Sequence, residues 1–79
     1  MNLITKLKNH KTILQLRRKI DSILITDRFD EATKRITEAY SLLDRLRGKI
    51  HENDLYKFIS QLLRTEAKLE DYHFLGYID

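Results

Sequence analysis

Few side chains in this chain have a type and spacing that could support chemistry, and the three histidines are the first to consider. His10, His51 and His73 share no spacing that is typical of metal ligands. Glu70 and His73 would lie on one face of a helix, but they offer only two candidate ligands. We therefore expect surface or core histidines and no metal site.

The acidic residues give no sign of an acid–base pair. Asp30 is adjacent to Glu31 and Glu70 to Asp71, and adjacent residues point to different sides of a helix. Charges at such positions are typical of helix-dipole compensation and solubility. The residues therefore predict no catalytic site and no cofactor, and we expect a protein that is not an enzyme.

One segment resembles part of an enzyme family. The residues Leu-Arg-Arg-Lys-Ile-Asp at positions 16–21 resemble the opening helix motif of the all-helical chorismate mutases, and the stretches 42–46 and from 55 onward echo later segments. In that family an arginine of this motif binds a substrate carboxylate within a helical dimer, so the resemblance implies a mutase-like enzyme as one alternative function. The chain departs from the family between Asp21 and Leu42, where the segment that supplies the catalytic lysine and the second arginine has no room.

The spacing of apolar residues predicts the elements that must position any site: three helices at about residues 3–24, 27–47 and 54–75. Short connections favour antiparallel neighbours. We expect an all-α fold in a single domain, residues 1–79, built as an antiparallel three-helix bundle or a long helical hairpin. We also expect dimerisation, because three rods of about 33 Å bury only a thin core.

The clearest periodic signal lies in the second helix, where apolar residues alternate strictly at intervals of three and four. Such a seam is typical of a helix edge that other helices cover. Its members are Phe29, Ala32, Ile36, Ala39, Leu43, Leu46 and Ile50.

The first helix has two apolar lines that do not coincide. One consists of Leu3, Leu7, His10 and Leu14, and the other of Ile13, Leu16, Ile20 and Ile23. Either the buried face is wide, or the helix bends near residues 9–11, which are weak helix formers.

Polar residues and glycines predict where the helices begin and end. Thr26 or Asp27 is expected to cap the second helix, and Asn53 or Asp54 the third. Gly48 is expected to end the second helix, because glycine accepts the left-handed conformation of a helix stop.

The end of the chain has its own signal. Gly76 predicts a Schellman motif after the third helix, with Tyr77 touching Tyr72. The run from 72 to 78 is unusually aromatic and apolar. Either these residues fold back on the helices, or Phe74, Tyr77 and Ile78 anchor a partner or the second protomer.

Composition limits the class of protein. An apolar fraction of 42% is too high for a disordered chain, and no apolar run reaches the length of a membrane span. Cysteine is absent, which fits a reducing compartment. We expect a cytoplasmic protein.

Charge is distributed unevenly along the chain. Residues 1–25 hold six basic groups and one acid, whereas residues 51–79 hold three basic groups and six acids. The basic first helix supports an alternative function, a regulatory protein that binds nucleic-acid phosphates. The residues that would do so are Lys6, Lys8, Lys11, Arg17, Arg18 and Lys19.

The function that these patterns favour is non-catalytic binding of another protein, as a small adaptor, inhibitor or assembly chaperone. Basic side chains border the apolar lines of the first two helices. Either the third helix docks between the other two, or an acidic helix of a partner occupies the basic-edged groove, in a homodimer or a hetero-complex. The residues predicted to bind the partner are Arg17, Arg28, Arg35, Arg47, Ile13, Leu16, Ile20, Phe74 and Tyr77.

Overall fold

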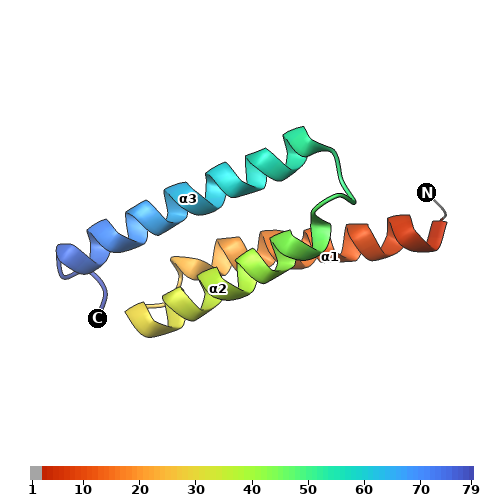
Figure 1. Cartoon of the computed structure of the whole chain (residues 1–79). Coiled ribbons are helices and arrows are strands. Elements are labelled where there is room, and N and C mark those ends of the chain that lie inside the picture. The colour runs from red at the N-terminus through yellow and green to blue at the C-terminus, as the bar shows by residue number, and fades with distance from the viewer. Residues whose placement is uncertain (1–2) are drawn as a thin grey trace.

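Residues 3–79 are described by a computed structural model, in which they form three α-helices. These are α1 (Leu3–Ile23), α2 (Phe29–Leu46) and α3 (Glu52–Phe74). They run antiparallel in chain order, and the molecule is elongated, with extents of 48 × 19 × 14 Å (Figure 1). The predicted all-α class is confirmed, and the packing of the helices is consistent with a bundle. Each helix boundary lies within two residues of its expected position.

Helix α2 is the central element. It packs most extensively on α1 and less on α3, whereas α1 and α3 have little contact with each other. The third helix therefore packs mainly on α2 and does not lie evenly between the other two helices, as one of the two alternatives expected. The edge of α2 explains this arrangement, because the completely buried Ala32 and Ala39 have small side chains that let neighbouring helices approach closely.

The predicted seam of α2 is the middle of the hydrophobic core. Four of its seven members are buried, and Phe29, Ile36 and Ile50 are partly buried against the same cluster. The other helices complete the core through large side chains, of which Leu16 of α1 and Leu62 of α3 have no exposed surface. Burial of such side chains contributes about 1.5–3 kcal/mol each.

Both helix starts differ from the expected caps. Arg28 is the N-cap of α2, and its side chain does not cap the helix; the Thr26 hydroxyl accepts a hydrogen bond from the Arg28 N–H, which lies before the helix. At α3 the cap is His51, whose Nδ1 accepts a hydrogen bond from the Asn53 N–H at 3.1 Å. An imidazole nitrogen thus takes the place that a serine or aspartate oxygen usually has, and α3 begins two residues earlier than expected.

Gly48 ends α2 as predicted. Arg47 is extended at φ −60° and ψ 125°, Gly48 has φ +77°, and the Lys49 N–H donates to the Leu46 carbonyl at 2.9 Å. These are the features of a type II turn, which requires positive φ at its third residue. The chain therefore leaves the helix at Leu46 and does not continue through the glycine.

The predicted Schellman motif closes α3. Gly76 has φ +81°, the Tyr77 N–H donates to the Tyr72 carbonyl at 2.8 Å, and the Gly76 N–H donates to the His73 carbonyl at 3.2 Å. The rings of Tyr72 and Tyr77 meet edge to face, with centroids 6.2 Å apart. This contact is the one expected from the sequence.

After the motif the chain folds back onto the turn between α1 and α2. Ile78 is buried in the core. The Asp79 N–H donates to the Asp27 carbonyl at 3.1 Å, and the Phe29 N–H donates to the Asp79 carbonyl at 2.6 Å. The Phe29 ring also stacks on His73, with centroids 4.0 Å apart. These contacts form a terminal clasp that holds the end of α3 against the beginning of α2.

Candidate partner-binding site

The two apolar lines of α1 face different directions. Leu16, Ile20 and Ile23 are buried against the other helices, and Ile13 is partly buried beside them. The other line faces solvent, with exposed fractions of 71% for Leu3, 60% for Leu7 and 36% for Leu14. The helix therefore has one face inside the core and a second apolar face without a partner among residues 3–79.

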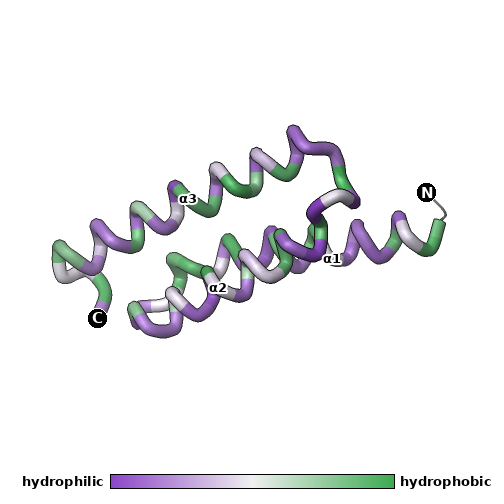
Figure 2. Tube along the Cα trace, viewed as in Figure 1, coloured by the Kyte–Doolittle hydropathy of each residue, from purple (hydrophilic) through white to green (hydrophobic). Residues whose placement is uncertain are grey.

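This outward face extends past the rest of the molecule. The Asn9 side-chain amide donates to the Lys49 carbonyl at 3.2 Å, which places Asn9 level with the end of α2. Residues 3–8 continue for about 9 Å beyond that point, and α1 visibly projects past the beginning of α3 (Figure 1). Hydrophobic positions continue to the N-terminal end of the helix (Figure 2).

Positive charge borders the outward face on both sides. Helical spacing puts Lys6 and Arg17 along one border and Lys11 and Arg18 along the other. The single acid of α1 is Asp21, near its C-terminal end. The outward face is thus that of a basic amphipathic helix, which suits an acidic helical partner.

The inward line is not available to a partner. Leu16 and Ile20, predicted to supply partner burial, are 0% and 4% exposed because they belong to the hydrophobic core. Ile13 keeps part of its surface near Arg17 and Phe58. The sequence showed both lines of α1 but could not distinguish the covered one from the exposed one, so Leu3, Leu7 and Leu14 were not predicted as site residues.

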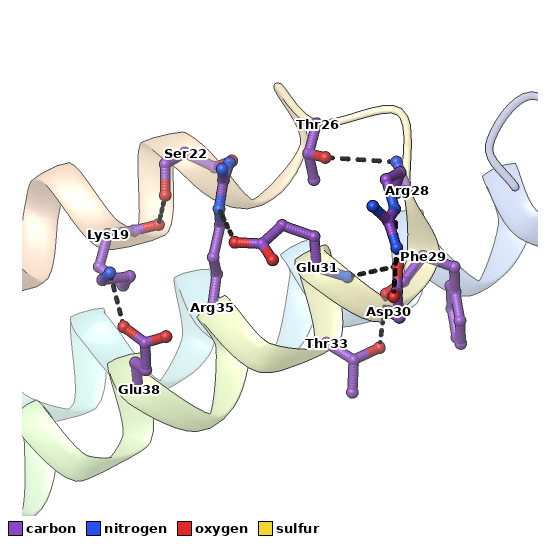
Figure 3. Close-up of polar contacts among 10 residues, drawn as sticks. All are labelled: Lys19, Ser22, Thr26, Arg28, Phe29, Asp30, Glu31, Thr33, Arg35 and Glu38. Atoms are coloured by element: carbon purple, nitrogen blue, oxygen red, sulfur yellow. Dashed lines mark hydrogen bonds and ion pairs between the residues drawn. The ribbon is translucent and has the colours of Figure 1, made fainter.

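Arg35 was predicted to select a partner, but its side chain makes contacts within the protein. Its guanidinium donates to the Ser22 carbonyl in the last turn of α1 and pairs with Glu31 at 3.4 Å (Figure 3). A cation at a helix C-terminus satisfies free carbonyl groups and interacts favourably with the helix dipole. The side chain is only 27% exposed, so Arg35 joins α1 to α2.

Lys19 makes a second link between the same helices. Its Nζ lies 2.7 Å from Glu38 Oε2 (Figure 3). The hydrogen bond from Lys19 lowers the pKa of the Glu38 carboxyl. Lys19, one of the residues proposed for nucleic-acid binding, is therefore already paired.

The other three predicted arginines lie apart from one another. Arg28 pairs with Asp30 at 2.9 Å on the surface, and this hydrogen bond raises the pKa of Arg28 and lowers that of Asp30. Arg47 lies 3.4 Å from Asp44, also on the surface. Arg17 places its guanidinium carbon 5.9 Å from the centroid of the Phe58 ring, within the range of a cation–π contact.

The C-terminal apolar residues were expected either to fold back on the helices or to anchor a partner, and the structure shows some of them buried and others exposed. Ile78 folds back on the helices, whereas Phe74 and Tyr77 are 89% and 74% exposed. They lie at the opposite end of the molecule from the projecting part of α1 (Figure 1). Phe74 and Tyr77 thus remain candidate anchors, separate from the outward face.

The residues proposed for phosphate binding do not form one surface. Lys8, Lys11, Arg18 and Lys19 line the groove between α1 and α2, where Arg45 joins them from α2. Lys6 and Arg17 lie along the other border of α1. The sequence did not indicate the contribution of Arg45, because it comes from a different helix.

Two of the three histidines make contacts that support the fold. His51 caps α3, and His73 stacks on Phe29. Within residues 3–79 no three histidine or acidic side chains come together as a group that could hold a metal ion. No helix of this part of the chain combines the length and the apolar character that a bilayer span requires.

Comparison of the chain with protein-family models, with curated proteins and with solved structures finds no match.

Proposed function

We propose that this protein is a non-catalytic interaction module that binds an acidic amphipathic helix of another protein on the outward face of α1. The observation that supports it is the row of Leu3, Leu7 and Leu14, which stays exposed while the chain buries a second apolar line of the same helix. Aliphatic residues at this spacing supply the anchors of helix-in-groove recognition. The cations on both borders favour an acidic partner and set its register.

A different protein fits this face better than a second copy of the chain. The acidic helix of a second copy would be α3, but α3 already buries Phe58, Leu62 and Leu69 in its own core. Its outer surface exposes Tyr56 and Leu63, and the cations Lys57 and Arg64 lie along the same surface. This surface carries both signs of charge, because the exposed Glu52 and Glu70 lie in line with Tyr56 and Leu63. It therefore matches a basic face less well than a purely acidic helix would.

The direct test uses a photo-crosslinking amino acid placed at Leu7 in the cell, with the same group at Leu63 as the control. Both sites are more than half exposed, at 60% and 53%, but only Leu7 lies on the outward face. We expect Leu7 to give a discrete adduct with one protein, and Leu63 to give none. Equal labelling at the two sites, or no adduct at Leu7, would contradict the proposal.

A second measurement checks the chemistry of the contact. Leu7→Asp should abolish the adduct of a crosslinker at Leu14, because a carboxylate would face an acidic partner across an apolar contact. Leu63→Asp is the matched control and should leave that adduct unchanged. Under this proposal the purified chain alone should sediment as a monomer and not as the dimer that the thin core led us to expect. A homodimer that survives Leu7→Asp would point to a different assembly.

A further inference from the structure

The groove between α1 and α2 holds a concentration of positive charge that the outward face of α1 does not explain. It consists of two adjoining hollows of about 590 and 350 Å³, which share Gln15 and Arg45. Six cations line these hollows, and Glu38 is the one carboxylate among the lining residues. The cations are Lys8, Lys11, Arg18, Lys19, Arg45 and Lys49.

This groove is more positive than the protein as a whole. Six cations less one carboxylate give +5, whereas the net charge of the whole chain is +3. Lys19 neutralises Glu38 through their ion pair. The other five cations form no ion pair within residues 3–79, and all five are exposed. A row of unpaired cations from two helices repels itself, so an anion in the groove is stabilised.

The shape of the groove suits an extended anion. Lys8 and Arg18 lie 10 residues apart on α1, which is about 15 Å of helix. Arg45 and Lys49 line the opposite wall from α2 and the turn that follows it. Cations thus face a bound chain from both sides along several of its charges, whereas a single small anion would meet only a few of them.

The remaining lining residues indicate the class of polyanion. Neutral hydrogen-bonding side chains line both hollows, and among residues 3–79 Leu42 is the only apolar side chain in the lining. The neutral polar residues are Asn9, Thr12, Gln15, Ser22 and Ser41. None of the lining side chains of this groove is aromatic, so it has no platform for stacking single-stranded bases. It also lacks the apolar anchors that an amphipathic helix or a bilayer surface would need.

We infer that the α1–α2 groove binds the sugar–phosphate backbone of a double-stranded nucleic acid, without reading its sequence. Backbone contacts by lysine and arginine, with support from amides and hydroxyls, are the usual sequence-independent mode of binding. The groove lies beside the proposed protein-binding face and shares with it the border residues Lys11 and Arg18. Arg45 and Lys49 belong to the groove alone, so either proposal can fail while the other stands.

The test measures binding of a fluorescent DNA duplex of arbitrary sequence to the intact protein as salt is varied. If five cations contact phosphates, affinity should fall about 500-fold between 50 and 200 mM salt, since each contact contributes about 0.9 to the logarithmic slope. Arg45→Glu with Lys49→Glu should weaken binding at low salt and reduce that fall to about 40-fold. Circular dichroism confirms that the variant keeps its helices.

The matched control is Lys57→Glu with Arg64→Glu, which changes the net charge equally on the outer surface of α3. It should retain the salt dependence of the unmodified protein. An equal loss in the control would show that net charge alone attracts the duplex, and would overturn the inference. Absence of binding at low salt would do the same.

Three unlabelled competitors distinguish other polyanions: a duplex of unrelated sequence, a single strand and polyglutamate. Duplex of unrelated sequence should displace the labelled duplex fully. Tighter binding of a single strand, or equally effective displacement by polyglutamate, would mean that the groove prefers a different class of ligand. Either result would refute the assignment of a duplex.

Discussion

The backbone N–H of Phe29 donates a hydrogen bond of 2.6 Å to the carbonyl oxygen of Asp79, at the opposite end of the sequence from α1. The bond satisfies one of the free N–H groups at the beginning of α2, where the side chain of the N-cap residue Arg28 makes no capping bond. It also fixes the terminal clasp against the turn between α1 and α2. Stability of the α1–α2 corner should therefore depend on residues that follow α3.

The first prediction tests this dependence through Ile78, which is 7% exposed. Ile78→Ala should lower the free energy of unfolding by about 2–3 kcal/mol, because it removes a buried side chain and loosens the clasp. Thermal unfolding should shift downward by about 4–8 °C for each kcal/mol. Phe74→Ala is the control, since Phe74 is 89% exposed; a similar loss in both variants would contradict the role of the clasp.

The second prediction separates two arginines that the sequence placed in one class. Arg35→Met keeps the aliphatic stem but removes the bond to the Ser22 carbonyl and the pair with Glu31. We expect urea denaturation to show a loss of about 1–2 kcal/mol, because a charged hydrogen bond at a helix C-terminus disappears. Arg28→Met should leave the urea midpoint unchanged, since both side chains of its ion pair are about 70% exposed. Equal effects would show that Arg35 does not join the helices.

The third prediction concerns the backbone at Gly48, with φ +77°. A Cβ atom at this position would meet nothing within 4 Å, so substitution costs only backbone strain. Gly48→Ala should reduce stability by about 1–2 kcal/mol, and Gly48→Asn by less, because asparagine tolerates the left-handed region better. Chemical denaturation of the two variants gives this order; the reverse order would mean that the type II turn does not limit the end of α2.

What the sequence predicted correctly is local in origin. The seam of α2 and the stops at Gly48 and Gly76 depend on residues within a few turns of each other, and periodicity and glycine conformation reveal such features. The features that were missed join residues distant in sequence. Phe29 meets Asp79, and Lys8 shares a groove with Arg45, and no single helix carries a signal for either.

The candidate site could not be predicted for the same reason, because it depends on how α1 packs against the other helices. Spacing revealed both apolar lines of α1, yet Leu16 and Leu7 looked equivalent until the packing of α2 decided which line is buried. The predicted cap of α3 was wrong for another reason. Sequence rules favour Asn53 or Asp54 at a helix start, but the helix begins earlier, and the imidazole of His51, on an extended backbone, accepts from the Asn53 N–H instead.

The last prediction uses the phenol of Tyr40, which lies between α2 and α3. Burial, together with the neighbouring Glu66 carboxylate, raises the pKa of Tyr40 to about 12. The folded state therefore holds the phenol proton more tightly than the unfolded chain, whose tyrosine pKa is about 10. The resulting stabilisation is complete below about pH 10 and is lost as the pH rises towards 12.

Thermal unfolding at pH 8, 10 and 11.5 should thus show a steeper alkaline loss of stability in the unmodified protein than in Tyr40→Phe, which has no proton to release at this position. The difference in absorbance between the two proteins at 295 nm follows ionisation of Tyr40 itself, and it should rise only as the pH approaches 12. Parallel stability curves, or ionisation complete near pH 10, would show that the interface between α2 and α3 does not shield this phenol.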